Sequence, residues 1–349
     1  MVENERIAIV GTGSWGTTLA VMLAREGRSV TLWARTPGEA QKLKAARENK
    51  AFLPGVILPH NLAITSSLQG ALTSCRMLML VIPARYMREN VRQVRPYLEK
   101  DAIILSAAKG LETETALRMS EVIAEELPSE FHERICVLSG PNLSREIVAG
   151  FPAGTVIAAR DENVAEFAQR VIMTPLFRVY THDDVVGVEL GGALKNIIAL
   201  GAGAADQFGS GDNAKAVYMT RGLAEITRLG VAAGANPLTF AGLAGVGDLV
   251  CTCASRHSRN HYLGEELAKG RSLADIQASM KQVAEGVDTT KAAVKLGRRY
   301  AVEMPITEAI YQVLFEGKDP RQVVKEMMLR GPKREFEGPV EEWFKGLRA

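Results

Sequence analysis

The feature that most constrains the fold is a regular alternation, in the first half of the chain, of short apolar runs with amphipathic segments. A short run that is apolar throughout is typical of a strand buried on both faces. Repeated alternation of strands and helices predicts an α/β fold with a doubly wound parallel sheet of the Rossmann type. The expected strands lie at 6–10, 29–33, 62–65, 77–83, 102–108, 135–140, 155–159 and 177–180, and amphipathic segments lie at 84–98 and 115–127.

The strand pattern stops after Tyr180, and the rest of the chain has helical patterns. A chain of 349 residues, of which 47% are hydrophobic, is long enough to fill two ordinary cores. We therefore predict a Rossmann-like dinucleotide-binding domain at residues 1–187 and an all-α substrate-binding domain at residues 188–349. In the second domain, helices are expected at 187–204, 213–232, 259–269, 288–300, 305–315 and 320–329.

The distribution of charge excludes one class of partner. The 42 basic and 40 acidic residues are mixed along the chain and leave a net charge of +2. There is no block of like charges of the kind that marks a nucleic-acid-binding arm. We therefore expect no nucleic-acid partner, although the chain can form a local basic site of phosphate size.

Two segments bear on the location of the protein. The first expected strand begins at residue 6, which leaves no room for a signal peptide, so a cytoplasmic protein is expected. The apolar segment 187–204 approaches the length of a membrane span. Because Glu189, Lys195 and Asn196 would be costly in hydrocarbon, we predict a core helix there and no integral membrane segment.

The four cysteines predict no metal site. Cys251 and Cys253 are too close together for ordinary zinc-ligand spacing and have no second pair nearby, while Cys75 and Cys136 stand apart from them. Reduced structural thiols are expected at all four positions.

A glycine-rich turn follows the first expected strand in the sequence AIVGTGSWGTTLA. Gly11, Gly13 and Gly16 have the G-x-G-x-x-G spacing, and a helix is expected to open at Ser14. Glycine permits a tight turn, the approach of backbone to a pyrophosphate and close packing of helix on strand, while the helix N-terminus faces the anion. The strand–turn–helix context predicts a dinucleotide site, and turn glycines without a ligand are the alternative.

The end of the second expected strand favours NADPH. An NAD site usually has Asp or Glu there to bind the ribose 2′-hydroxyl, whereas this chain has Trp33-Ala34-Arg35-Thr36. An arginine without a carboxylate matches the 2′-phosphate of NADPH. We expect NADPH/NADP to be preferred and NADH/NAD to be usable; the alternative is that Arg35 is an ordinary solvated charge.

Two further stretches, SAAKGLE (106–112) and LSGPNLSREI (138–147), follow strands at the edge where a doubly wound sheet binds ligands. Lys109 either reaches into the crevice or is an ordinary loop lysine. Gly140 and Asn142 either bring a backbone N–H and an amide to a ligand or form a plain turn before a helix.

In the second half, a single carboxylate, Asp248, lies in the apolar, glycine-rich run LAGVGDLVCTC. It either takes part in a site or caps a helix. A polar cluster follows, in which Arg259 is a candidate bidentate phosphate ligand beside Ser258 and Asn260.

The most unusual charge is Lys195, which lies in GVELGGALKNIIALGAG. A buried ammonium loses its hydration and regains little unless it is paired. Lys195 is therefore either a functional group or a lysine whose charged end reaches solvent at a helix surface.

Together these motifs resemble the bacterial-type NAD(P)-dependent sn-glycerol-3-phosphate dehydrogenases. The resemblance depends on GTGSWGTTLA, ENKAFLPG, AAKGLE, SGPN, GVELGGALKNIIALGAG, LAGVGDLVCTC, HSRN, VAEGVDTT and EMPITEAIYQVLF, which follow one another in family order over nearly the whole chain. It implies a 6-phosphogluconate-dehydrogenase-like fold, a homodimer, and the reversible reduction of dihydroxyacetone phosphate to sn-glycerol 3-phosphate for phospholipid synthesis.

The resemblance also implies roles for individual residues. Lys195 is implied as the proton acceptor, and Lys109 and Asp248 are grouped with it as catalytic residues. Implied cofactor contacts fall on Gly11, Gly13, Ser14, Trp15, Gly16, Arg35, Lys109, Ser144, Arg259, Val283 and Glu285. Implied substrate contacts fall on Lys109, Gly140, Asn142, Lys195, Asn196, Asp248, Ser258, Arg259 and Asn260. Many relatives have Ser or Thr in place of Asn142 and Ala in place of Ser144.

The implied reaction explains a lysine within an apolar helix. Oxidation of a secondary alcohol needs a base, and reduction of the ketone needs an acid. Desolvation and the neighbouring charge of Lys109 both favour the neutral amine of Lys195, which makes it usable in both directions. The amide of Asn196 can bind the substrate without adding charge.

Two other functions are compatible with parts of this pattern. One is another two-domain NADP-dependent hydroxyacid dehydrogenase, which would not need Arg259 as a phosphate ligand. The other is a non-enzymatic dinucleotide-sensing module, for which the glycine-rich turn alone would suffice.

Overall fold

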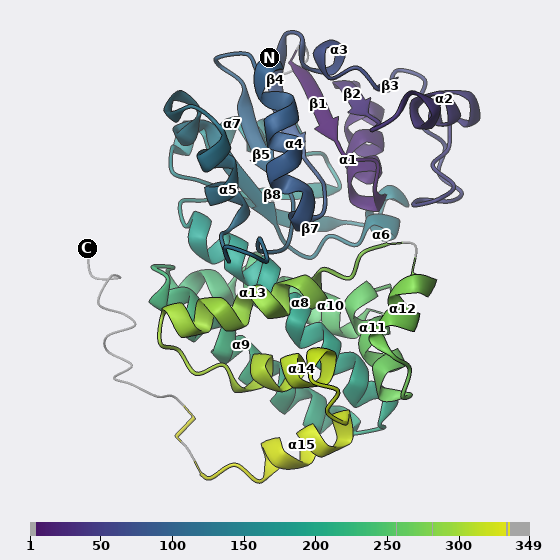
Figure 1. Cartoon of the computed structure of the whole chain (residues 1–349). Helices are drawn as coiled ribbons and strands as arrows, with labels where there is room; N and C mark the ends of the chain where they lie inside the picture. The colour runs from purple at the N-terminus through teal and green to yellow at the C-terminus, as the bar shows by residue number, and fades with distance from the viewer. Residues whose placement is uncertain (1–4, 256, 281, 333, 336–349) are drawn as a thin grey trace.

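The computed structural model describes residues 5–255, 257–280, 282–332 and 334–335. A single sheet occupies the first half of the chain, and helices occupy the second half, below the sheet in Figure 1. The eight strands are β1 (Arg6–Val10), β2 (Ser29–Trp33), β3 (Ala63–Thr65), β4 (Cys75–Leu80), β5 (Ile103–Ser106), β6 (Ile135–Ser139), β7 (Ala153–Ala159) and β8 (Phe177–His182).

The strands are arranged in the order β3-β2-β1-β4-β5-β6-β7-β8. The chain first builds outward from β1 to one edge and then outward from β4 to the other, which is the predicted doubly wound arrangement. All neighbours from β3 to β6 are parallel. Ile9 of β1, for example, lies between Leu32 of β2 and Met79 of β4.

The last two strands depart from the predicted parallel sheet. β7 is antiparallel to β6, and β8 is parallel to β7. The connection between β6 and β7 contains only α6 (Ser144–Val148). A helix of this length rises about 7 Å, whereas a strand as long as β6 spans about 17 Å, so the chain does not return to the start of β6. β7 therefore pairs with β6 in the antiparallel direction.

Successive residues of the inner strands face opposite sides of the sheet and form two cores. Ile7 and Ile9 pack with α1 (Ser14–Arg25), α2 (Pro37–Ala46) and α7 (Glu162–Ile172). Ala8 and Val10 pack with α3 (Leu68–Leu72), α4 (Met87–Val94) and α5 (Met119–Glu126). Both sides of the sheet are thereby covered, which explains why its strands are apolar throughout.

The second half consists of helices around a central α8 (Val185–Gln207), as Figure 1 shows. The others are α9 (Gly211–Ala232), α10 (Asp248–Ala254), α11 (Arg259–Ala268), α12 (Leu273–Ser279), α13 (Glu285–Arg299), α14 (Pro305–Phe315) and α15 (Pro320–Met328). Short 3-10 helices lie at Ala84–Tyr86, Arg95–Tyr97, Ser129–Arg134 and Pro237–Ala241, and a π-helical turn lies at Leu243–Gly247. The sequence patterns predicted α8, α9, α11, α13, α14 and α15 but not α10 or α12.

Helix α8 is the core of the helical half. Within the described ranges it is the one helix long and apolar enough to cross a membrane. Its apolar 18-residue stretch is 83% buried inside the protein. This burial confirms the predicted core helix. Glycines allow α11 to approach α8 closely, because a Cβ atom at Gly264 would be 1.8 Å from the carbonyl oxygen of Leu200, and one at Gly203 would be 2.0 Å from that of His261.

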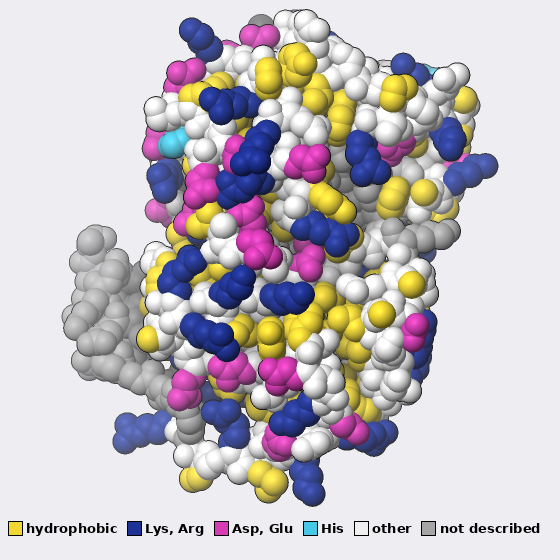
Figure 2. All heavy atoms as spheres, viewed as in Figure 1, with side chains coloured by type: hydrophobic (Ala, Val, Ile, Leu, Met, Phe, Trp, Pro, Cys, Tyr) yellow, Lys and Arg dark blue, Asp and Glu magenta, His cyan; other side chains and the backbone are white. Residues whose placement is uncertain are grey.

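The surface agrees with the mixed charge of the sequence. On the face in Figure 2, Lys and Arg side chains are interspersed with Asp and Glu over both halves, without a broad field of one sign. The four cysteines are free thiols, as predicted.

Candidate active site

A cleft of about 680 Å³ lies where the sheet meets the helical half. Its walls come from the turn after β1, the segments that follow β2, β4, β5 and β6, and helices α8, α10, α11 and α13. Ligands of doubly wound sheets bind at this carboxyl edge. All the residues with a predicted site role line the cleft, apart from Gly16 and Gly140.

Gly16 and Gly140 lie behind the cleft wall. A Cβ atom at Gly16 would be 2.0 Å from the carbonyl oxygen of Gly11. Gly140 has a φ of +152°, and a Cβ atom there would be 2.9 Å from the Cα of Thr155. The structure therefore gives both glycines a packing role, and their ligand contacts stay predictions.

The turn after β1 has the shape that a dinucleotide requires. Gly11 has a φ of +123°, and a Cβ atom there would be 2.2 Å from the carbonyl oxygen of Val81, so no other residue fits. Gly13 faces open space, with no heavy atom within 4 Å of the Cβ position. Because α1 begins at Ser14 without a side-chain cap, its first N–H groups are left for a ligand or water.

Two polar atoms near this turn also point to a ligand. Trp15 Nε1 and Asn142 Oδ1 are buried without a hydrogen-bond partner, although both residues line the cleft. Buried polar atoms in folded proteins are nearly always paired. The turn and these two atoms fit a bound nicotinamide dinucleotide.

The centre of the cleft is a carboxylate shared by two lysines. Asp248, at the start of α10, is 2% exposed. Its Oδ2 accepts a hydrogen bond from Lys109 Nζ at 2.7 Å, and its Oδ1 accepts one from Lys195 Nζ at 2.9 Å. This arrangement decides between the alternatives for all three residues: Lys109 reaches into the crevice, Lys195 is buried, and the carboxylate of Asp248 binds lysines instead of capping a helix.

Burial and charge act in opposite directions on this group. Burial lowers the pKa of Lys109 to about 8, with Lys195 adding to the decrease and Asp248 opposing it. Burial alone would raise the pKa of Asp248, but the two ammonium groups outweigh it and hold that pKa below its ordinary value. Asp248 is therefore ionised, and the pKa of Lys109 lies well below its ordinary value.

The amide of Asn196 holds three elements together. Its Nδ2 donates to the carbonyl oxygen of Lys109 at 3.0 Å, and its Oδ1 accepts from Asn260 Nδ2 at 2.9 Å. Asn260 Oδ1 in turn accepts the N–H of Gly286 at 2.9 Å. Asn196 thus fixes the loop after β5, α11 and α13 around Lys195, which leaves a substrate contact at Asn196 as a prediction.

The opposite wall carries a second charged group. Arg259, the first residue of α11, donates from Nη1 to the carbonyl oxygen of Val283 at 2.8 Å. Burial raises the pKa of Glu285 to about 7; Arg259 opposes this increase, and Asp288 adds to it. Arg259 has no carboxylate within 4.0 Å among the residues that the structure describes, so it is available to an anion.

At the far end of the cleft, Arg35 and Glu39 line the wall beside the glycine turn. Arg35 is exposed, and Glu39 Oε1 accepts a hydrogen bond from Thr12 Oγ1. Glu39 was not among the predicted site residues, because it lies beyond the end of β2, in the first turn of α2. A search of that turn for carboxylates would have found it.

Sequence reasoning also missed two polar residues of the cleft. Thr252 Oγ1 accepts from Lys195 Nζ at 2.5 Å; its position four residues after Asp248 on α10 was an available signal. Gln282 Nε2 donates to Ser14 Oγ at 2.9 Å across 268 residues, and no sequence signal points to that contact.

The comparisons with known proteins identify the family of the chain. The family profile described as the NAD-dependent glycerol-3-phosphate dehydrogenase N-terminus matches residues 6–165, and that of the C-terminus matches residues 184–325. The chain belongs to the NAD-dependent glycerol-3-phosphate dehydrogenase family. The resemblance predicted from the motifs is thereby confirmed, and with it an NAD(P)-dependent oxidoreductase.

Relatives of this dehydrogenase family are similar over almost their whole length. A glycerol-3-phosphate dehydrogenase [NAD(P)+] of Dehalococcoides mccartyi is 50% identical over 344 residues, which is 98% of this chain and 96% of that one. One from Desulfitobacterium hafniense is 50% identical over 95% of this chain and 93% of that one. The crystal structure of glycerol-3-phosphate dehydrogenase from Coxiella burnetii has a TM-score of 0.89 at 34% identity, covers 94% of this chain and 100% of its own, and confirms the predicted fold class.

Proposed function

We propose that the chain catalyses the reversible reduction of dihydroxyacetone phosphate to sn-glycerol 3-phosphate with NAD(P)H and supplies glycerophospholipid synthesis. The observation that carries the proposal is the pair of lysines on one buried carboxylate, together with Arg259 in the same cleft, which has no carboxylate within 4.0 Å among the described residues. The lysines suit proton transfer to a carbonyl oxygen, and the arginine suits a phosphate.

The cofactor would be held by the turn after β1, by Arg35 and by Val283 and Glu285 at the start of α13. When bound, it supplies the hydride that reduces the ketone. We propose that NADPH is preferred, because the positive charge of Arg35 complements a 2′-phosphate. Residues 1–187 are proposed as the dinucleotide-binding domain and residues 188–349 as the substrate-binding domain, which also contributes Val283 and Glu285 to the cofactor.

Lys195 is the proposed acid in the direction of reduction. Its ammonium lies against Asp248 and Thr252, so the charged form is held in place until the ketone oxygen takes the proton. In the reverse direction the neutral amine accepts the hydroxyl proton. Lys109 binds the other oxygen of Asp248 and adds positive charge where the alkoxide develops.

The substrate phosphate is assigned to Arg259 with Ser258 and Asn260. All three line the cleft, and they surround the N-terminus of α11, where helix N–H groups attract anions. Holding the phosphate fixes the distance from the carbonyl carbon to Lys195. The protein is further assigned to the cytoplasm as a homodimer, in line with the motifs that it shares with its family.

The test is an NADPH absorbance assay with purified protein. Oxidation of NADPH is expected with dihydroxyacetone phosphate and only marginally with unphosphorylated dihydroxyacetone, and NADH is expected to support a slower rate. Reduction of a 2-keto acid in preference to the phosphorylated ketone would assign another dehydrogenase activity. Binding of NADPH without turnover of any of these ketones would favour a sensing module.

A further inference from the structure

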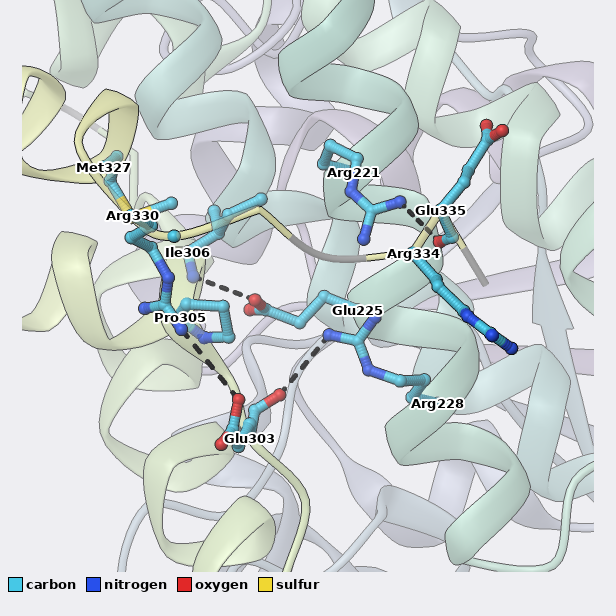
Figure 3. Close-up of a pocket in the computed structure, with 11 residues that line it drawn as sticks. Arg221, Glu225, Arg228, Glu303, Pro305, Ile306, Met327, Arg330, Arg334 and Glu335 are labelled. Atoms are coloured by element: carbon cyan, nitrogen blue, oxygen red, sulfur yellow. Dashed lines mark hydrogen bonds and ion pairs between the residues drawn. The ribbon is translucent and has the colours of Figure 1, made fainter. Parts of the chain in front are cut away.

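A second cavity lies in the helical half, away from the cleft. It has a volume of about 470 Å³ and shares no lining residue with the cleft. Its walls are α9, the turn before α14, the end of α15 and the chain that follows α15 (Figure 3). Cavities of about 300–1,000 Å³ are the size of small-molecule sites.

Four arginines line this cavity: Arg221, Arg228, Arg330 and Arg334. Arg221 and Arg228 are seven residues apart on α9 and therefore lie on one face of the helix. Both side chains are half-buried, and Figure 3 shows them extending into the space between α9 and the chain after α15.

Few acidic partners reach these guanidinium groups from the part of the chain that the structure describes. Arg221 Nη1 donates to the backbone carbonyl of Glu335 at 2.8 Å, and Arg228 Nη2 donates to that of Glu303 at 3.4 Å. Arg330 is 3.9 Å from the carboxylate of Glu303. Among the residues that the structure describes, Arg221, Arg228 and Arg334 have no carboxylate within 4.0 Å.

The buried carboxylate of this cavity is already engaged. Glu225 is 1% exposed, and its oxygens accept the N–H groups of Ile306 and Thr307 at 2.8 and 2.9 Å and the hydroxyl of Thr307 at 2.7 Å. Glu225 thereby satisfies the first turn of α14, which has no side-chain cap of its own. Figure 3 shows the side chain of Glu335 pointing away from the other labelled side chains.

We propose that this cavity, named here the arginine pocket, is a second binding site for a small, multiply charged oxyanion. Arginine binds phosphate and carboxylate oxygens through paired, charge-assisted N–H groups. Several guanidinium groups around one cavity match an anion with more than one charged group, because a single charge would leave the others unpaired. This site is independent of the proposed reaction, since none of its residues lies in the cleft.

Isothermal titration calorimetry tests the proposal with inorganic pyrophosphate and with citrate, which distinguish a phosphate ligand from a carboxylate ligand. NADPH and sn-glycerol 3-phosphate, which do not react with each other because both are in the reduced form, are kept at saturation so that the proposed cofactor and substrate phosphate sites of the cleft are filled. The full-length protein is compared with Arg221→Gln/Arg228→Gln and with Arg298→Gln, which removes an exposed charge from α13 outside the pocket.

We expect one equivalent of at least one anion to bind the unmodified protein and Arg298→Gln alike. Arg221→Gln/Arg228→Gln loses two charge-assisted partners, so its affinity for the anion should fall by about tenfold or more. That variant should keep the far-UV circular dichroism and the NADPH-dependent rate of the unmodified protein. The absence of binding of both anions, or equal affinity in the pocket variant, overturns the proposal.

Discussion

Lys109 and Lys195 lie in different halves of the fold, yet they donate hydrogen bonds to the two oxygens of one carboxylate. Lys109 follows β5 and Lys195 lies in the middle of α8, while the carboxylate of Asp248 comes from α10. Coulombic repulsion between two ammonium groups is offset only while this carboxylate stays ionised between them. The same carboxylate therefore contacts the proposed proton-transfer residue and links α8 and α10 to the loop after β5.

The first prediction concerns the proton donor. Lys195→Ala should lower the turnover number by about 10²–10⁴-fold, the usual contribution of a general acid or base. The affinity for NADPH, measured by the quenching of protein fluorescence, should be nearly unchanged, because the glycine turn is untouched. Lys42→Ala, an exposed lysine on α2, is the control. Substantial turnover in Lys195→Ala would assign that lysine a structural role only.

The second prediction concerns the shared carboxylate. Asp248→Asn leaves two buried ammonium groups without their counter-charge, and breaking a buried ion pair in this way typically costs about 3–5 kcal/mol. Urea unfolding should show a loss of this size in the free energy of unfolding. Glu114→Gln, which removes a carboxylate that is 88% exposed, should cost less than about 1 kcal/mol. Similar losses in both variants would show that the pairing contributes nothing.

The third prediction concerns pH. Burial raises the pKa of Glu285 from 4.5 to about 7, so the folded protein binds more protons at this site than the unfolded chain between these values. Stability from this group is therefore present at low pH and is lost as pH rises through about 7. Relative to Glu285→Gln, the free energy of unfolding should fall from about pH 5 to about pH 8. Glu316→Gln, an exposed site, should give no such difference, and a parallel pH profile for Glu285→Gln would contradict the raised pKa.

The fourth prediction concerns the cofactor. Arg35→Asp should weaken the binding of NADPH by about 10–100-fold, the range expected for one hydrogen bond to a charged group. The binding of NADH should be nearly unchanged. Glu39→Gln is the converse variant. Removal of a carboxylate from the same end of the cleft should strengthen NADPH relative to NADH, because repulsion of the 2′-phosphate is relieved. Kd values for both cofactors measure these effects, and an equal loss of both cofactors in Arg35→Asp would exclude a contact with the 2′-phosphate.

The fifth prediction concerns the substrate phosphate. Arg259→Lys should reduce kcat/KM strongly for dihydroxyacetone phosphate and little for dihydroxyacetone, because an ammonium cannot present two parallel donors in one plane. Part of the loss should appear in kcat, since the phosphate orients the ketone. Comparing the loss of kcat/KM on the two substrates isolates the contribution of the substrate phosphate. The same factor on both substrates would reassign Arg259 to the cofactor or the fold.

The sequence predicted those parts of the molecule that depend on local pattern. The strands are recognisable because both faces of the sheet are covered, and Lys195 stands out because a charge within an apolar helix is unusual. Helix α10 escaped notice because Gly242, Gly245 and Gly247 precede it, and glycine disrupts a helical pattern.

The contacts that define the site depend on distance in space. The pair Lys109–Asp248 joins residues 139 apart, and nothing near either residue indicates the other. The arginine pocket is likewise not indicated by the sequence, because Arg221 and Arg228 appear there as ordinary solvated charges of an amphipathic helix. Folding alone brings Glu335, beyond α15, to Arg221 of α9.

The order of the elements along the chain has a consequence for synthesis on the ribosome. All eight strands lie between Arg6 and His182, so the whole sheet can pair before α8 has emerged. The cleft, however, takes its last wall residue, Glu285, from the start of α13. A nascent chain that ends before α13 therefore exposes the carboxyl edge of the sheet without the α13 residue that completes the proposed cofactor site, and it gains that residue only when the last 65 residues are made.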